Sequence, residues 1–215
     1  MPLLSFFASA PEQVASLTIE QIVATAGDGS LKDGASSQAE LRHYLTMVSS
    51  EKLKVYIEAC LSSSFSKSGQ VLQDLVNEVG RRLDYEVTNG LYQGVSGKIG
   101  FDGLWTSPEG HSVIVEVKTT DAYRISLDTL ATYRRKLDEA HKLSSSSSVL
   151  IVVGRQDTGE LEAQIRRSRH AWDMRLISAE ALMRLLQLKE STGSAATSLQ
   201  TVACSRLLNI LASIG

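Results

Sequence analysis

The chain has 215 residues, with 22 basic and 24 acidic side chains and a formal net charge of -2, which suits a globular domain of ordinary size with a smaller region attached. No apolar run is long enough to span a bilayer, the first residues lack the basic segment of a secretory signal, and two cysteines cannot build a disulfide framework or a four-ligand zinc site, so we expect a cytoplasmic protein without membrane contact. A slightly acidic chain also argues against tight nonspecific binding to nucleic acid.

The first part of the chain is predicted to be helical and carries no recognisable chemistry. Apolar residues recur at three- and four-residue spacing from Pro11 to about Leu61, the pattern of amphipathic helices. The glycine-rich segment 27–34 is predicted to be a surface turn, because it lacks the ligand spacing of a calcium loop. Cys60 and Cys204 lie in helical contexts and are expected to be small core residues. We therefore expect an N-terminal helical region over residues 1–66.

The middle of the chain alternates between strand and helix patterns. The predicted elements are a helix at 70–83, strands at 85–90, 99–105 and 112–119, a helix at 127–143, a strand at 149–153, a helix at 160–172, a strand at 174–177 and a helix at 179–188. This order, α-β-β-β-α-β-α-β-α, predicts an α/β domain in which helices flank a mixed sheet that is antiparallel at its start. Residues 190–215 are predicted to form a polar linker and a C-terminal helical tail.

Two charged side chains interrupt the apolar strand expected at 112–119. Because side chains alternate across a strand, Glu116 and Lys118 share one face with Ile114, and the valines at 113, 115 and 117 line the other. Charged groups at the centre of such a strand are costly when they are buried. In the strand before it, Asp102 is expected on the face opposite to three large apolar side chains, Ile99, Phe101 and Trp105.

The turn between these two strands sets which residues face each other. With a turn centred on Glu109, residues whose numbers add to 218 lie opposite, which pairs Asp102 with Glu116. Opposed side chains have Cβ atoms about 5 Å apart, where two like charges destabilise a sheet unless something compensates them. A divalent cation is the natural candidate, since hard oxygen ligands suit Mg²⁺ and Mn²⁺. The alternative is an exposed edge hairpin whose charges form cross-strand salt bridges.

These residues resemble the signature of a known nuclease superfamily. The resemblance lies in Gly100-Phe-Asp102-Gly and Val115-Glu116-Val-Lys118-Thr-Thr120, set within the order α-β-β-β-α-β. They are similar to the motif of the PD-(D/E)XK superfamily, which has the restriction-endonuclease-like fold, although Phe101 stands where the name has proline. The resemblance covers roughly residues 70–188 and implies a catalytic domain of that fold over residues 67–189.

The resemblance also implies a role for each residue of the motif. Asp102, Glu116 and the main-chain carbonyl of Val117 would bind one or two Mg²⁺ or Mn²⁺ ions. Lys118 would orient or deprotonate the attacking water and offset charge in the transition state of phosphodiester hydrolysis. Many members add an acidic residue from the helix before the hairpin, which here is expected to be Glu78. The alternatives on the same helix are Asp74 and Gln73.

Cationic residues elsewhere are candidates for contacts with DNA phosphates. The densest cluster is Arg166-Arg-Ser-Arg-His170. On a helix, Arg166, Arg169 and His170 would share a face, with an ordinary solvated helix face as the alternative. Trp172 follows this cluster and is expected to pack in the core rather than to stack on bases. The further candidates lie around the hairpin and after it: Lys98, Arg124 and Arg134.

Together these observations predict a metal-dependent endonuclease that hydrolyses DNA. Cutting of both strands by a single-site enzyme usually needs two active sites, so for that subclass we expect a homodimer. The alternative function is a non-catalytic module that keeps the same fold to bind nucleic acid or protein. The four histidines are scattered without zinc-ligand spacing, and no nucleophile elbow is present, which argues against the common zinc and serine hydrolases.

Overall fold

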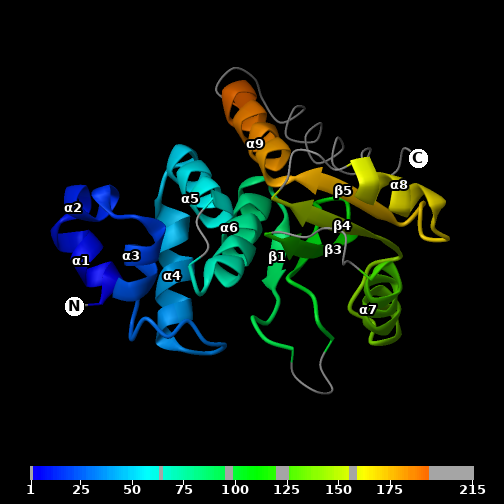
Figure 1. The fold of residues 1–215 in the computed structure, drawn as a ribbon, viewed down its shortest axis with the longest axis horizontal. Helices are drawn as coiled ribbons and strands as arrows, with labels where there is room; N and C mark the ends of the chain where they lie inside the picture. The colour runs from blue at the N-terminus through cyan, green and yellow to red at the C-terminus, as the bar shows by residue number, and fades with distance from the viewer. Residues whose placement is uncertain (1, 63–64, 95–98, 120–125, 155–158, 194–215) are drawn as a thin grey trace. The chain divides into compact units, whose positions relative to one another are not determined.

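The computed structural model describes residues 2–62, 65–94, 99–119, 126–154 and 159–193. The chain divides into two compact units, residues 1–78 and 79–215, and the division falls inside helix α6 (Ser68–Arg82) (Figure 1). Across the described residues, no helix combines the length and the apolar character that crossing a membrane requires.

The first unit is helical, as expected. It contains five helices before α6: α1 (Leu3–Ser9), α2 (Pro11–Ser16), α3 (Ile19–Thr25), α4 (Ser36–Met47) and α5 (Ser50–Ser62). A capping box starts α3, in which Thr18 accepts from the Gln21 N–H and the Gln21 side chain accepts from the Thr18 N–H. The segment 27–34 is a turn, as predicted, with positive φ at three of its glycines. Helix α1 was not anticipated from the sequence.

Apolar side chains and two tyrosines form the core of the first unit. The hydroxyls of Tyr44 and Tyr56 lie 2.9 Å apart in a buried hydrogen bond, and the Phe7 ring packs edge-on against Tyr44. Cys60 is 3% exposed, which confirms it as a core residue, and burial raises the pKa of its thiol to about 12. Cys204 lies outside the described residues.

The second unit is an α/β domain. After α6 its elements are β1 (Glu86–Asn89), β2 (Gly103–Thr106), β3 (His111–Lys118), α7 (Leu127–Glu139), β4 (Ser146–Val153), α8 (Gly159–Arg167), β5 (Met174–Ser178) and α9 (Ala179–Gly193). The strands form one sheet in the order β1-β2-β3-β4-β5 (Figure 1). The pairs β1–β2 and β2–β3 are antiparallel, and β3–β4 and β4–β5 are parallel. The predicted element order and mixed sheet are confirmed.

The β2–β3 hairpin has the predicted register. Its pairs run from Gly103 with Val115 to Thr106 with Ser112, and each pair of numbers adds to 218. The turn closes through a hydrogen bond from the Gly110 N–H to the Ser107 carbonyl, with Gly110 at φ +83°. Because β3 lies at the centre of the five-stranded sheet, the hairpin is not an exposed edge hairpin.

Strand β2 begins four residues later than expected, at Gly103 instead of Ile99. The chain passes so close to Gly90 that a Cβ there would lie 1.7 Å from the Phe101 carbonyl oxygen. The Gly90 N–H donates to the Asp102 carbonyl at 3.0 Å. The segment before Gly103 is thus tied to the residue that follows β1, and it is not part of the regular β2–β3 ladder.

Because β2 starts late, one predicted strand face is wrong. Ile99 and Phe101 do not share a face with Trp105, because strand alternation does not extend to them. They pack against the core cluster that contains Leu104, whereas Trp105 packs against Gly80 of α6, where a Cβ would lie 2.6 Å from the indole.

Helices α7 and α8 cover the sheet face that carries the charged residues of the hairpin. Their buried leucines and isoleucine form one core with side chains from β2, β3, β4 and β5: Leu104, Ile114, Leu127, Leu130, Leu137, Val149, Ile151, Val153, Leu161, Ile165 and Met174. By alternation, Glu116 and Lys118 project on the same side as Ile114. The site therefore lies where this covered face ends, at the carboxyl ends of β3 and β4.

Helix ends differ from the prediction in three places. Helix α7 ends at Glu139, α8 ends at Arg167, and α9 continues to Gly193. The early end of α8 matters most, because Arg169 and His170 then lie in a turn and do not share a helix face with Arg166.

Candidate active site

Asp102 stands at the point where the chain enters β2. Its backbone N–H donates to the Val115 carbonyl at 3.0 Å, and its carboxylate oxygen Oδ2 accepts from the Val117 N–H at 2.6 Å. These two bonds lock the residue against β3 from both its main chain and its side chain. Asp102 lies one residue before Gly103, whose pair with Val115 is the last regular pair of the ladder. These two hydrogen bonds, rather than strand pairing, therefore hold Asp102 near Glu116.

Glu116 and Lys118 lie two residues apart on β3 and form an ion pair. The Lys118 Nζ is 2.5 Å from the Glu116 Oε1. The side chain of Glu116 is 13% exposed and that of Lys118 is 39% exposed, so the pair lies at the boundary between core and solvent. The ammonium remains accessible to a ligand while it is held by the carboxylate.

The two carboxylates and the ammonium perturb one another. Burial and the charge of Glu116 raise the pKa of Asp102 to about 7, against the opposing effects of the Val117 N–H and of Lys118. Burial disfavours the charged form of Lys118, but the charge and hydrogen bond of Glu116 outweigh it, helped by Asp102, and the pKa of Lys118 is raised. Two carboxyl groups therefore share one ammonium group. When both are ionised, the cluster carries more negative than positive charge.

Oxygen ligands gather at this point of the sheet. The N–H and C=O of one strand residue point to the same side, so the Val117 carbonyl faces the side on which its N–H meets Asp102. The described part of the chain holds no group of three or more His, Cys, Asp or Glu side chains close enough to bind a metal. A hard cation held here would combine two carboxylates with a main-chain carbonyl and water, a donor set that suits Mg²⁺.

A hollow of about 170 Å³ opens beside the two carboxylates. Asp102 and Glu116 form one side of it, and the rest comes from the segments 91–94 and 99–101 and from Tyr133 of α7. The Tyr133 Oη lies 3.0 Å from where a Cβ of Gly100 would stand, so the phenol reaches this loop. Tyr92 and Tyr133 were not predicted as site residues, since no spacing links them to the motif. We call this cavity the tyrosine hollow.

The acidic residues of α6 belong to the first unit. Asp74 is 1% exposed, and its carboxylate is paired with Arg42 Nε at 2.9 Å, which gives it a structural role within that unit. Glu78 and Gln73 are each 4% exposed. The assignment of Glu78 as a further catalytic acid stays a prediction.

Arg134 is engaged far from the carboxylates. Its guanidinium donates to the Ser147 hydroxyl at 2.9 Å and pairs with Asp173 at 2.8 Å. Ser147 lies four residues before Ile151, the partner of Glu116 in the sheet, which places it roughly 13 Å away along the strand. The assignment of Arg134 as a contact for DNA phosphate stays a prediction.

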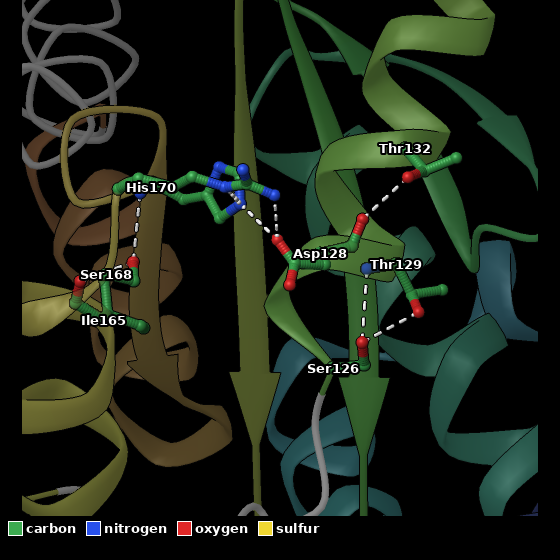
Figure 2. A network of polar contacts seen from close by, with 8 residues as sticks. Ser126, Asp128, Thr129, Thr132, Ile165, Ser168 and His170 are labelled. Carbon is green, nitrogen blue, oxygen red and sulfur yellow. Dashed lines mark hydrogen bonds and ion pairs between the residues drawn. The ribbon is translucent and has the colours of Figure 1, made fainter.

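The cationic residues at the end of α8 and in the turn after it are paired with acids, and Figure 2 shows Asp128 opposite His170. Arg169 and the His170 Nε2 both meet the Asp128 Oδ1, at 2.7 and 2.9 Å, and Arg166 pairs with Glu162 at 3.1 Å. Asp128 stands in the first turn of α7, which Ser126 caps by accepting from the Thr129 N–H. Hydrogen bonds to His170 and Arg169 lower the pKa of Asp128.

Three further predicted residues have different outcomes. Trp172 is 72% exposed, so its predicted place in the core is wrong. The reason is that α8 ends five residues before it, which removes Trp172 from the helix's apolar face. Lys98 and Arg124 lie outside the described residues.

The structure brings together four of the residues singled out from the sequence: Asp102, Glu116, Val117 and Lys118. No protein-family model matches the chain, and no curated protein matches it either. The case for a function therefore comes from the geometry and chemistry of this cluster, which we call the carboxylate cluster.

Proposed function

We propose that the chain is a metal-dependent endonuclease with a restriction-endonuclease-like fold, which hydrolyses phosphodiester bonds in DNA. The observation that carries this proposal is the carboxylate cluster, in which Asp102 is locked against β3 while its pKa is raised by burial and by Glu116. A cluster that destabilises its own charges at the carboxyl end of a strand is typical of a catalytic site. The order α-β-β-β-α-β around a mixed sheet supports the fold assignment.

The cluster's residues fit Mg²⁺ by charge and donor type. Asp102, Glu116 and the Val117 carbonyl would hold the ion, and two carboxylates beside one ammonium leave a charge deficit that a cation offsets. When bound, Mg²⁺ supplies a Lewis acid for the phosphate and lowers the pKa of a coordinated water. Manganese fits the same donors.

The remaining chemistry falls to this chain's own side chains. Lys118 lies partly in solvent and carries a raised pKa, so it is charged at neutral pH and is suited to stabilise negative charge on the phosphate. Its ion pair with Glu116 fixes the direction of the ammonium. Asp102 is positioned by two hydrogen bonds with Val115 and Val117 and needs no rearrangement to act as a ligand.

Cleavage of supercoiled plasmid and labelled oligonucleotides in Mg²⁺, Mn²⁺ or EDTA tests the proposal. We expect metal-dependent cleavage that Glu116→Ala and Lys118→Ala each reduce by about 10²–10³-fold or more. Matched controls on exposed positions of α7 are Glu139→Ala and Lys136→Ala, which should cleave like the wild type. Cleavage that survives both cluster substitutions, or that persists in EDTA, would refute the proposal.

A further inference from the structure

The tyrosine hollow is a small cavity. Its volume of about 170 Å³ suits a ligand of one ring system rather than an extended one. The larger groove between α7 and α8, about 1020 Å³, is lined by charged side chains that pair with each other, such as Asp128 and Arg169. The smaller cavity is the better candidate for specific recognition.

The lining of the hollow fits a nucleobase rather than an anion. Two aromatic residues from different segments, Tyr92 and Tyr133, line it together with the neutral polar residue Gln93. Base stacking on aromatic rings is typical of proteins that bind unpaired nucleic acid, whose bases are free of a partner. Because Asp102 and Glu116 line the same cavity, a lone phosphate would be repelled there, whereas a neutral base would not.

Position links the hollow to the reaction. Its wall includes both carboxylates, so a base held in it would sit beside a phosphate placed at the carboxylate cluster. Helix α7 holds the Tyr133 ring in place, and the close approach of its phenol to Gly100 fixes the ring against the 99–101 segment. Bases stacked inside a duplex cannot enter such a side cavity without first unstacking, at a cost of a few kcal/mol.

We propose that the tyrosine hollow is a nucleoside subsite that accepts one unstacked base next to the cleaved phosphodiester, which makes unpaired DNA the preferred substrate. This inference rests on the proposed nuclease function and specifies its substrate class. Single strands, loops and frayed ends present such a base without further cost, whereas a fully paired duplex must be opened first.

The first test compares one labelled strand as a single strand, in a perfect duplex and in a duplex with a central mismatch. We expect kcat/KM for the single strand to exceed that for the duplex by about tenfold or more, with the mismatch in between. Equal cleavage of all three substrates would overturn the inference while leaving the nuclease proposal intact.

The second test removes the ring or the base. Tyr133→Ala should raise KM for a single strand by about tenfold, since stacking contributes about 1–3 kcal/mol per base, and Tyr133→Phe should raise it much less because it keeps the ring. A substrate that is abasic at the cleaved nucleotide should be processed equally by wild type and Tyr133→Ala. If Tyr133→Ala is equally impaired on the abasic substrate, the hollow does not bind the base.

Equilibrium binding separates the two proposals. Labelled single-stranded DNA and its abasic counterpart are titrated with full-length wild type and Tyr133→Ala. Suppose that the wild type binds single-stranded DNA more tightly than the abasic DNA, that Tyr133→Ala does not, and that neither protein cleaves DNA. This result would support the subsite and contradict the nuclease proposal. Identical affinities for both DNAs in wild type and variant would overturn the subsite.

Discussion

Two charged clusters of the second unit, both in contact with α7, are built in opposite ways. In the carboxylate cluster two acids share one lysine at the edge of the core, and the pKa of Asp102 is raised. In the cluster of Asp128, Arg169 and His170, one exposed acid accepts hydrogen bonds from a guanidinium and an imidazole, and its pKa is lowered. We call the second group the α7–α8 ion cluster.

The difference explains why we propose the carboxylate cluster, and not the α7–α8 ion cluster, as the ligand site. A raised carboxyl pKa means that the folded chain disfavours the charge it holds, and such an arrangement persists at sites where a ligand supplies the missing charge. A lowered pKa on an exposed acid is what any surface ion pair produces, and such pairs contribute little to stability. The number of charged residues does not distinguish the two clusters, and by that measure the stretch 166–170 would be the stronger candidate for a ligand site.

The largest effect should come from breaking the geometry of the carboxylate cluster at Gly90. A Cβ at this position would lie 1.7 Å from the Phe101 carbonyl oxygen, so Gly90→Ala must displace the backbone next to Asp102. We expect the free energy of unfolding to fall by about 3 kcal/mol and cleavage to be lost. Urea denaturation and the plasmid assay measure both. Gly69→Ala is the matched control, since nothing lies within 4 Å of its Cβ position, and equal behaviour of the two variants would contradict this account.

The next effect is a pH dependence of opposite sign in the two clusters. In the folded chain Asp102 has a pKa of about 7, above the ordinary 3.8, so without metal the native state holds its proton more tightly than the unfolded state. The free energy of unfolding should therefore fall as pH rises from about 4 to about 7. Asp102→Asn removes this contribution, and its stability relative to the wild type should rise by on the order of 1–3 kcal/mol over that range.

The α7–α8 ion cluster supplies the comparison for this pH titration. Because the pKa of Asp128 is lowered, its contribution to stability is present above its ordinary pKa and is lost as pH falls through its lowered value. Asp128→Asn should therefore lose stability relative to the wild type as pH rises through the acid range. Denaturant unfolding of both variants in EDTA from pH 3 to pH 8 measures how the stability of each variant relative to the wild type changes with pH. A change in the same direction for both variants would contradict the proposed difference between the clusters.

A smaller effect is expected at Arg134, which ties α7 to β4 and to the turn before β5. Arg134→Ala removes the bonds to Ser147 and Asp173 and should lower the free energy of unfolding by about 1 kcal/mol. Cleavage and its dependence on salt should not change, because the guanidinium is engaged far from the carboxylate cluster. Arg135→Ala is the matched control on an exposed neighbour. A weaker salt dependence in Arg134→Ala alone would instead indicate a contact with phosphate.

The smallest effect is expected within the α7–α8 ion cluster itself. Arg169 is 78% exposed, so Arg169→Ala should leave the unfolding transition unchanged. Because its charge is already matched by Asp128, KM for DNA should also stay at the wild-type value. A raised KM together with a salt slope reduced by about one would show that Arg169 leaves Asp128 to contact DNA.

Much of the second unit could be predicted because its patterns are local. Period-two stretches bounded by turn residues gave the strands, and the four-residue turn at Ser107–Gly110 gave the hairpin register. With the register known, Glu116 and Lys118 follow from alternation along β3. These inferences need only neighbouring residues, and the structure agrees with each.

The errors arise where distant segments meet. The late start of β2 depends on the approach of Phe101 to Gly90, and the exposure of Trp172 depends on where α8 ends against the sheet. Tyr133 comes to the carboxylates only because α7 packs back across the strands. Periodicity within one element does not report how that element packs against the rest of the chain.

The sequence by itself determined the element order, the hairpin register and the three charged residues of the motif, because turn chemistry and side-chain alternation are encoded over a few residues. Tertiary structure alone decided how those charges behave. Burial and the convergence of β2, β3 and the chain before Gly103 raise the pKa of Asp102, and α7 brings Tyr133 to complete a hollow beside it. Exposure, by contrast, leaves the more highly charged stretch after α8 as a set of ordinary ion pairs.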